Sequence, residues 1–420
     1  MKENNVARNL VVSLSGEFLS KIPLYLFEFL LASWLLVNEY AEWAVMILFV
    51  RMGPYLHLGA LSYFNKCYPL LIGEGSQVQY LVIKETSGII NSLFFIYLGM
   101  ASFLYLFNVI DIKIFLVLFS LSLLQQYSFF QAKARCEGEF RSFVIGLLIF
   151  AIVQLSAAYL LVENYRVLGA AFSIFLGYFC SVIYYLIVSD KPLNARLARP
   201  NTFRKVLSIG YAPFLLTISA FLLQVSDRII LLWVGSEEHI AFYGFYALFF
   251  QLGITIVNSL GKVLGPYILI VSGRSKVQDA LGVGELNVYF IFFCSSVFSL
   301  FFWQYGSLFL ELYFPQYMSG AVGVYNYAMS GFLLSVSLVY YPHLIAARKE
   351  VQVIKVNLLF SFLLMVSIFV CSRFFINNFY FSILSLLING LFSFVLIRIL
   401  EKYLSIKLFC VKAIHLLVLF

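Results

Sequence analysis

Charged residues are scarce in this sequence of 420 residues. Asp, Glu, Lys and Arg together make up 11% of it, whereas 62% of the residues are hydrophobic and 19% are aromatic. A soluble domain needs enough polar surface to cover its core, and this composition does not supply it. The scarcity of charge therefore excludes a soluble protein and predicts an integral membrane protein built from helices.

Motifs that bind metals or form disulfides are also missing from the sequence. The six cysteines are scattered without a Cys-x-x-Cys pair, and the four histidines are equally dispersed. We therefore expect the cysteines to act as small apolar residues, and we expect no metal site and no cofactor. The first apolar stretch has no small-x-small cleavage site and is interrupted by Glu17 and Lys21, so we do not expect a cleavable signal peptide.

Apolar runs of helix length recur along the whole chain. A helix that crosses a bilayer needs about 20 apolar residues, at a rise of about 1.5 Å each. Such runs occupy residues 9–37, 42–72, 79–107, 111–134, 141–162, 166–189, 207–234, 241–271, 284–304, 323–346, 352–373 and 378–398. The sequence thus predicts about twelve transmembrane helices.

Basic residues concentrate in every second loop. The remaining loops hold only Lys113, Arg166 and Arg373, together with most of the loop acids. By the positive-inside rule the basic loops face the cytoplasm, which places both termini there. The net charge of +8 is then a consequence of topology, and we expect no nucleic acid partner.

The longest basic connection, residues 189–205, contains two prolines and no apolar periodicity. It predicts an N-terminal six-helix lobe at 1–190, a cytoplasmic linker at 191–206 and a C-terminal six-helix lobe at 207–402. An even number of spans starts both lobes on the same side of the membrane, so any symmetry between them should be parallel. Residues 403–420 are apolar but include two lysines, which predicts a cytoplasmic interfacial tail.

Three charges share one face of the first predicted helix. Glu17, Lys21 and Glu28 follow each other at steps of four and seven, within about 40° on a helical wheel. A charge that faces lipid at the bilayer centre costs about 2.5 to 3.5 kcal/mol. We therefore expect these side chains to face a wet cavity, with Pro23 kinking the helix beside them. The alternative is an i,i+4 pair between Glu17 and Lys21, with Glu28 reaching outward.

Three further predicted helices carry polar stripes. Their members are Arg51, Tyr55, Ser62 and Lys66 in the second span, Thr217, Gln224 and Arg228 with Asp227 beside them in the seventh, and Gln251, Thr255, Asn258 and Lys262 in the eighth. Ionisable residues therefore concentrate in the first two helices of each lobe. A parallel repeat would bring these four helices together around a central cavity.

The excess of basic residues in these stripes predicts a cavity that binds an anion. The candidate substrate-binding residues are Lys21, Arg51, Lys66, Gln224, Arg228, Asn258 and Lys262. Arginine can hold phosphate oxygens through two hydrogen bonds, whereas lysine acts as a point charge. Two alternatives stay open: Lys66 and Lys262 are snorkelling residues at cytoplasmic helix ends, and Arg228 is a structural partner of Asp227.

The acids Glu17, Glu28 and Asp227 are candidates for coupling to an ion gradient. A carboxylate in a cavity whose wetness changes also changes its affinity for protons, which connects a gradient to work. The alternative is that these acids only neutralise neighbouring cations. Both interpretations stay open at this point.

Three stretches resemble polysaccharide flippases. They are GALSYFNKCYPLLIGEG at 59–75, SDRIILLWVGSEEHIAFYGFYALFFQL at 226–252 and GFLLSVSLVYYPHLIAARKE at 331–350. Together with the helix plan, they make the chain similar to the Wzx-type O-antigen flippases of the MOP (multidrug/oligosaccharidyl-lipid/polysaccharide) exporter superfamily. The resemblance extends over nearly the whole chain.

The resemblance implies an all-α, MATE-like fold with two pseudo-symmetric six-helix bundles around a central cavity. It implies a transporter, not an enzyme, in the bacterial cytoplasmic (inner) membrane. The implied cargo is an undecaprenyl-pyrophosphate-linked oligosaccharide whose prenyl tail stays among the membrane lipids, with a proton or sodium gradient as the driving force. A polysaccharide polymerase and chain-length proteins are the implied protein partners.

Two other functions are alternatives to a flippase. A polytopic polysaccharide polymerase or ligase would need a long external loop, but the longest external stretch, about 305–322, holds one ionisable residue, Glu311, and no group of residues suited to transfer chemistry. The loop at 73–84 lacks the Asp-Arg-Gly signature of major-facilitator exporters. A multidrug-type exporter of the same superfamily stays open as the alternative.

Overall fold

The computed structural model of the chain describes residues 3–74, 79–188, 197–273, 277–341, 344, 349–374 and 378–404. Every regular element among these residues is a helix, which confirms the prediction of an all-α protein. Residues 189–196 of the predicted linker and residues 405–420 of the predicted tail lie outside the described residues.

The chain forms two compact units. Unit 1 comprises Met1–Phe214 and Val263–Arg274, and unit 2 comprises Leu215–Lys262 and Ser275–Phe420. Two long helices therefore contribute to both units, because the divisions at residues 214 and 262 fall inside helices. The predicted lobe boundaries at 190 and 207 stay predictions.

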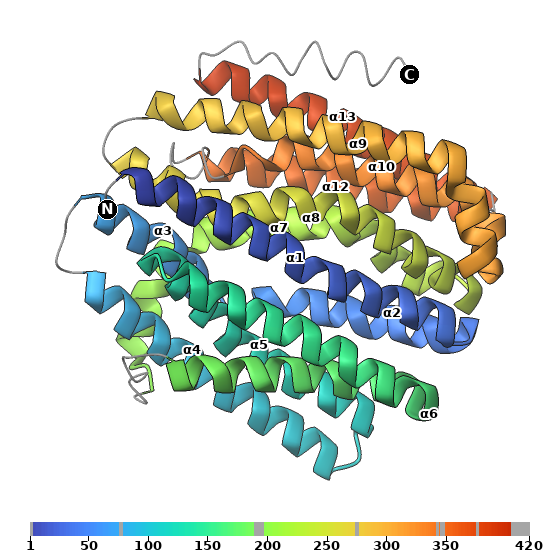
Figure 1. Ribbon diagram of the computed structural model, residues 1–420, viewed down its shortest axis with the longest axis horizontal. Coiled ribbons are helices and arrows are strands. Elements are labelled where there is room, and N and C mark those ends of the chain that lie inside the picture. Colours follow the sequence, from blue (N-terminus) through green and yellow to red (C-terminus); the bar gives the residue numbers. More distant parts are fainter. Residues whose placement is uncertain are drawn as a thin grey trace. The chain divides into compact units, whose positions relative to one another are not determined.

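Unit 1 is a bundle of long helices (Figure 1). In order these are α1 (Glu3–Trp34), α2 (Val37–Met52), the 3₁₀ turn η1 (Gly53–Tyr55), α3 (Ala60–Gly73), α4 (Gln79–Leu106), α5 (Ile112–Glu137) and α6 (Phe140–Val188). Helix α5 packs against α4 and α6, and α1 packs along α6. The first turns of α7 (Pro200–Val234) and the last turns of α8 (Glu237–Gly273) complete the unit.

Unit 2 continues from the remainder of α7. Its elements are α8 (Glu237–Gly273), α9 (Val277–Tyr313), the 3₁₀ segment η2 (Pro315–Gly320), α10 (Ala321–Leu338), α12 (Glu350–Phe374) and α13 (Asn378–Leu404). Helix α13 packs against α10 and α12, and α10 also packs against α9. Buried serines and asparagines join α10 to α13: the Asn389 side chain donates a hydrogen bond of 2.7 Å to Ser330.

The predicted spans fall on described helices, with two differences in continuity, but the predicted number of about twelve is not reached among the described residues. Within the described residues, eight helices are long and apolar enough to cross a membrane, or nine if one bent pair is counted as a single span. The predicted spans 141–162 and 166–189 both lie in α6, which is interrupted where Arg166 adopts the non-helical angles φ 50° and ψ −128°. The predicted span 42–72 is the bent pair, whose two parts meet at 44°.

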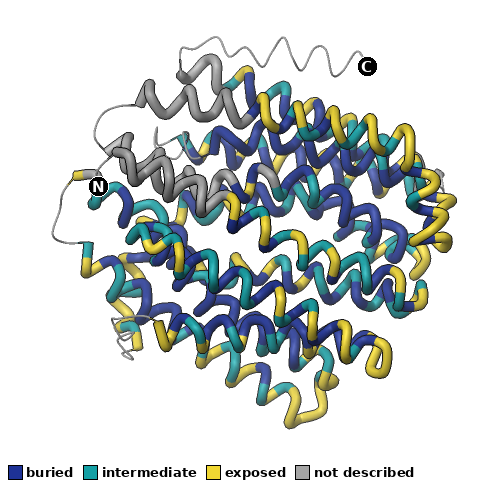
Figure 2. Tube along the Cα trace, in the orientation of Figure 1, coloured by how far each residue is buried: buried dark blue, intermediate teal, exposed yellow. Residues whose placement is uncertain are grey.

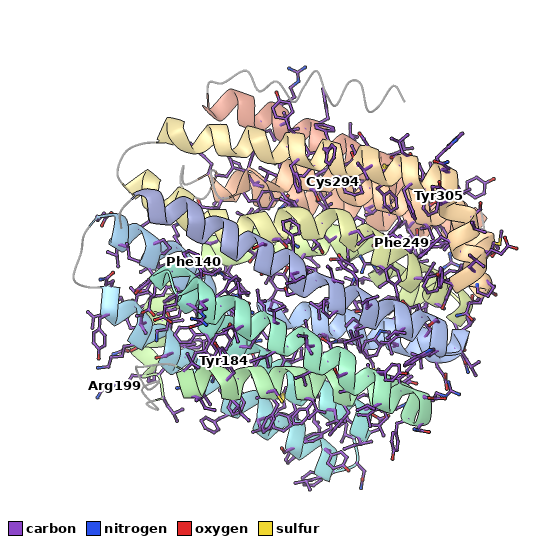
Figure 3. All side chains as sticks on the ribbon, viewed as in Figure 1. Phe140, Tyr184, Arg199, Phe249, Cys294 and Tyr305 are labelled. Atoms are coloured by element: carbon purple, nitrogen blue, oxygen red, sulfur yellow. The ribbon has the colours of Figure 1, made fainter. Side chains whose placement is uncertain are left out.

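Exposed residues recur along the helices (Figure 2), and many of them are large and apolar. Trp303 on α9 is 92% exposed, and Phe95 and Ile96 on α4 are 60% and 59% exposed. Such residues are stable where lipid replaces water as the solvent. The five cysteines within the described residues, including Cys294 labelled in Figure 3, are free thiols.

Helices α8 and α10 approach each other through glycine. A Cβ atom added at Gly253 would lie 2.5 Å from the backbone nitrogen of Phe332, and one added at Gly331 would overlap the carbonyl oxygen of Phe250. The Ser335 hydroxyl donates a hydrogen bond of 2.7 Å to the Gly253 carbonyl across the same contact. Small residues at a membrane helix interface allow this close approach.

We expect Gly331→Ala to destabilise the protein by about 1 to 3 kcal/mol, because the added methyl group meets backbone atoms that cannot rotate away. Thermal unfolding in detergent measures the effect. Gly99→Ala is the matched control, since nothing lies within 4 Å of a Cβ at that helical position. Equal stability of the two variants would contradict the close contact between α8 and α10.

Candidate functional site

The first charged cluster of unit 1 is built around Glu17 of α1. Its side chain is fully buried, and the Lys21 Nζ atom lies 3.5 Å from Glu17 Oε1. The carboxylate also interacts electrostatically with Tyr127 of α5 and Tyr185 of α6. Glu17 therefore faces the protein interior, and the i,i+4 pair considered from the sequence is present.

Glu28 joins α1 to α2 in the second cluster of unit 1. Trp43 of α2 donates its indole N–H to Glu28 Oε2 at 3.3 Å, and its ring packs edge-on against Phe27 at 5.7 Å between centroids. The positive charge of Arg51, in the last turn of α2, acts on the same carboxylate. Glu28 therefore binds to the neighbouring helix instead of reaching outward to the membrane surface.

The polar stripe predicted for the second span is not on one helix, so this prediction was wrong. Arg51 ends α2, Tyr55 lies in η1, and Ser62 and Lys66 lie on α3. Between them Leu58 and Gly59 have φ angles of 49° and 89°, which interrupt the helical periodicity. A helical wheel drawn through the whole span therefore does not give the relative directions of these side chains. Lys66 is half-buried on α3.

Asp227 and Arg228 form the charged cluster of unit 2. They are 3% and 9% exposed, and Arg228 Nε lies 3.9 Å from Asp227 Oδ1. The Arg228 backbone N–H donates to Asp227 Oδ1 at 2.7 Å, and its Nη2 donates to the Gln224 carbonyl at 2.9 Å. The guanidinium carbon also lies 5.8 Å from the centroid of the Phe250 ring on α8. Arg228 is thus held by its own helix and by α8.

Two tyrosines beside this cluster were not singled out by the sequence analysis. Tyr243 of α8 interacts electrostatically with Asp227, and its ring packs edge-on against Tyr327 of α10 at 5.1 Å. Both hydroxyl groups are buried without a hydrogen-bond partner among the described residues. With 28 tyrosines in the chain, no spacing pattern distinguishes these two.

The stripe predicted for the eighth span lies on α8. Gln251 and Thr255 are half-buried, and Asn258 is exposed. The side chain of Lys262 lies outside the described residues. The candidate residues thus divide between the units, with Lys21, Arg51 and Lys66 in unit 1 and the other four in unit 2. Their convergence on one central cavity stays a prediction.

Each of the three candidate acids has a basic neighbour. Glu17 is beside Lys21, Glu28 interacts with Arg51, and Asp227 is beside Arg228. Burying a charge in an apolar environment is unfavourable unless an opposite charge or hydrogen bonds compensate it. An opposite charge therefore lies near each of the three acids, and whether the acids also couple transport to an ion gradient stays a prediction.

Comparison with known proteins identifies the fold. No protein-family model and no curated protein matches the sequence. A mutant of the Vibrio cholerae MATE transporter VcmN matches with a TM-score of 0.73 and 15% identity, over 96% of this chain and 98% of that chain. An outward-facing multidrug resistance MATE family transporter of the MOP superfamily matches with a TM-score of 0.73 and 11% identity, over 95% of each chain.

The chain has the fold of the MATE transporters of the MOP superfamily. This confirms the predicted MATE-like, all-α membrane fold, and with its apolar spans it makes the chain a multi-pass membrane protein. Both of these structural neighbours are named as MATE transporters, and neither is named as a polysaccharide flippase. These likenesses therefore show the fold of the chain alone.

Proposed function

We propose that the protein is a flippase that carries a polyprenyl-pyrophosphate-linked oligosaccharide, the repeat unit of an O-antigen or a related surface polysaccharide, across the cytoplasmic membrane by alternating access. The observation that carries this proposal is the excess of bases over acids in the polar stripes, where Lys21, Arg51, Lys66, Arg228 and Lys262 outnumber Glu17, Glu28 and Asp227. Five bases against three acids give these stripes a net charge of +2. A pyrophosphate complements that charge.

Coupling to a proton or sodium gradient is part of the proposal. Glu17, Glu28 and Asp227 lie in helices of the predicted pathway, and each is within reach of a base. A carboxylate that separates from its base during a conformational change becomes available to a proton or a sodium ion. The three ion pairs therefore supply the candidates for coupling.

The second candidate function is that of a multidrug-type exporter of the same superfamily. It is favoured by the name of one fold neighbour, a multidrug resistance MATE family transporter. A cavity for cations would need an excess of acids, however, and the described pairs leave none without a basic neighbour. The charge balance therefore favours the anionic cargo.

Transport by the purified protein in liposomes tests the two functions directly. We expect a fluorescent undecaprenyl-pyrophosphate-linked sugar to cross the membrane when a proton or sodium gradient is imposed, and a cationic dye such as ethidium not to be transported. Arg141→Gln, which removes an exposed base at the start of α6, is the control for general charge effects and should transport normally. Dye transport without movement of the lipid-linked sugar would favour the multidrug exporter.

A further inference from the structure

A groove in unit 1 is separate from the charged clusters. It has a volume of about 620 Å³, and its walls come from Leu58 before α3, from the middle of α4 and from residues 198–207 at the start of α7. Volumes of this order accommodate ligands of drug size. Ile96, which forms part of the α4 wall, is 59% exposed, so the groove opens on an apolar surface that lipid can reach.

The polar side chains of the groove walls form hydrogen bonds within the protein, with one exception. The Ser92 hydroxyl donates to the Gly88 carbonyl at 2.9 Å and accepts from the Ala198 N–H at 3.0 Å. The Tyr97 hydroxyl donates to the Leu56 carbonyl at 2.6 Å. Apart from Arg204, the walls thus offer mainly carbon to a ligand.

Arg204 is the exception. It lies on the wall of the groove and is exposed, and no described residue forms an ion pair or a hydrogen bond with its side chain. Its neighbour Lys205 is paired with Glu85 at 2.6 Å. A second exposed base, Arg199, precedes α7 and is labelled in Figure 3. An exposed arginine therefore lies on the wall of an otherwise apolar groove, with a second exposed base five residues before it in the chain.

The α4 wall of the groove lies in a helix that is long and apolar enough to cross a membrane. This wall runs from Ser92 to Tyr97, a rise of about 8 Å, which is about a quarter of a hydrocarbon core of about 30 Å. Arg204 belongs to the connection that the sequence predicts to be cytoplasmic, so we expect the groove to lie in the cytoplasmic leaflet.

We propose that this groove binds an anionic phospholipid of the cytoplasmic leaflet. One acyl chain lies along α4, and the phosphate is held by Arg204 with Arg199 nearby. Leu58, which is 39% exposed and adopts a left-handed φ of 49°, also lines the groove. A bulky residue is rarely held in this conformation without a structural or functional reason. The site is independent of the proposed cargo.

Native mass spectrometry of the full chain tests the site with two lipids of identical acyl chains, phosphatidylglycerol and phosphatidylethanolamine. We expect one phosphatidylglycerol to bind at least about fivefold more tightly, since one basic residue near a membrane surface contributes about that factor toward an anionic lipid. Arg204→Gln should remove this preference. Arg141→Gln, an exposed base elsewhere on unit 1, should retain it.

A second pair of variants tests the groove without changing charge. Ile96→Trp places a larger ring in the groove and should weaken phosphatidylglycerol binding about tenfold or more, because the ring occupies the path of the acyl chain. Phe95→Trp is the matched control, since Phe95 is equally exposed on the same turn but does not line the groove. If Arg204→Gln does not fold, the comparison of Ile96→Trp with Phe95→Trp still tests whether phosphatidylglycerol binds in the groove.

Three results would overturn the proposal. The first is equal binding of the two lipids by the unmodified protein. The second is that Arg204→Gln behaves like Arg141→Gln, or Ile96→Trp like Phe95→Trp. The third is that undecaprenyl phosphate binds tenfold more tightly than phosphatidylglycerol and displaces it, which would make the groove a cargo site.

Discussion

Arg51→Ala should abolish transport of the lipid-linked sugar and also destabilise the protein. Arg51 and Glu28 are both half-buried, so removing the base should cost less than the about 3 to 5 kcal/mol lost when one partner of a fully buried ion pair is removed. Here the charge left behind is Glu28, whose remaining described partner is the Trp43 indole N–H at 3.3 Å. Loss of transport by this variant alone therefore does not distinguish cargo binding from misfolding.

A double variant separates the two effects. Glu28→Gln keeps an acceptor for Trp43 and removes the negative charge, so Arg51→Ala/Glu28→Gln should recover most of the stability. If Arg51 binds the pyrophosphate, transport should stay absent in the double variant while Glu28→Gln alone folds and inserts normally. Thermal unfolding and the liposome assay measure both quantities. Recovered transport in the double variant would show that Arg51 serves only to neutralise Glu28.

Arg228→Ala is expected to lower the free energy of unfolding by about 3 to 5 kcal/mol, because Asp227 would remain buried without its base. The variant also loses the hydrogen bond to the Gln224 carbonyl and the contact with the Phe250 ring. Arg373→Ala is the control in unit 2. Arg373 is exposed and has a similar ring contact, at 5.2 Å from Phe369, so its loss should change stability little.

The double variant Asp227→Asn/Arg228→Gln distinguishes a structural pair from a substrate site. It removes both charges and keeps side chains of similar size, so we expect stability close to that of the unmodified protein. If Arg228 binds the anionic cargo, transport should be lost even though the protein is stable. Normal transport would mean that the Asp227–Arg228 pair has only a structural role, within α7 and in its contact with α8.

The helical class and the positions of the spans could be predicted from the sequence because they depend on local properties. A run of apolar residues long enough to cross a bilayer is visible in any window of the chain. The break inside the span 42–72 could not be predicted in the same way. Pro54 indicated a kink, but the left-handed angles of Leu58 and Gly59 separate α2 from α3 and change the direction of every later side chain.

The candidate residues could also be chosen from the sequence, because a charge in an apolar helix is conspicuous wherever it points. The residues with which they interact could not be predicted from the sequence. The interaction of Glu28 with Trp43 and Arg51 depends on how α1 packs on α2, and the contact of Arg228 with Phe250 depends on how α7 meets α8. Tyr243, Tyr327 and the groove at Arg204 had no sequence signal of their own.

Composition and hydrophobic periodicity by themselves determined that this chain is a multi-span helical membrane protein with charges placed inside its helices. Only the tertiary structure decided which base neighbours which acid, where the second span bends, and that an exposed arginine borders an apolar groove. The physical reason is the range of the interactions. Solvation by lipid acts on each segment separately, whereas ion pairs and ring contacts join side chains that packing alone brings together.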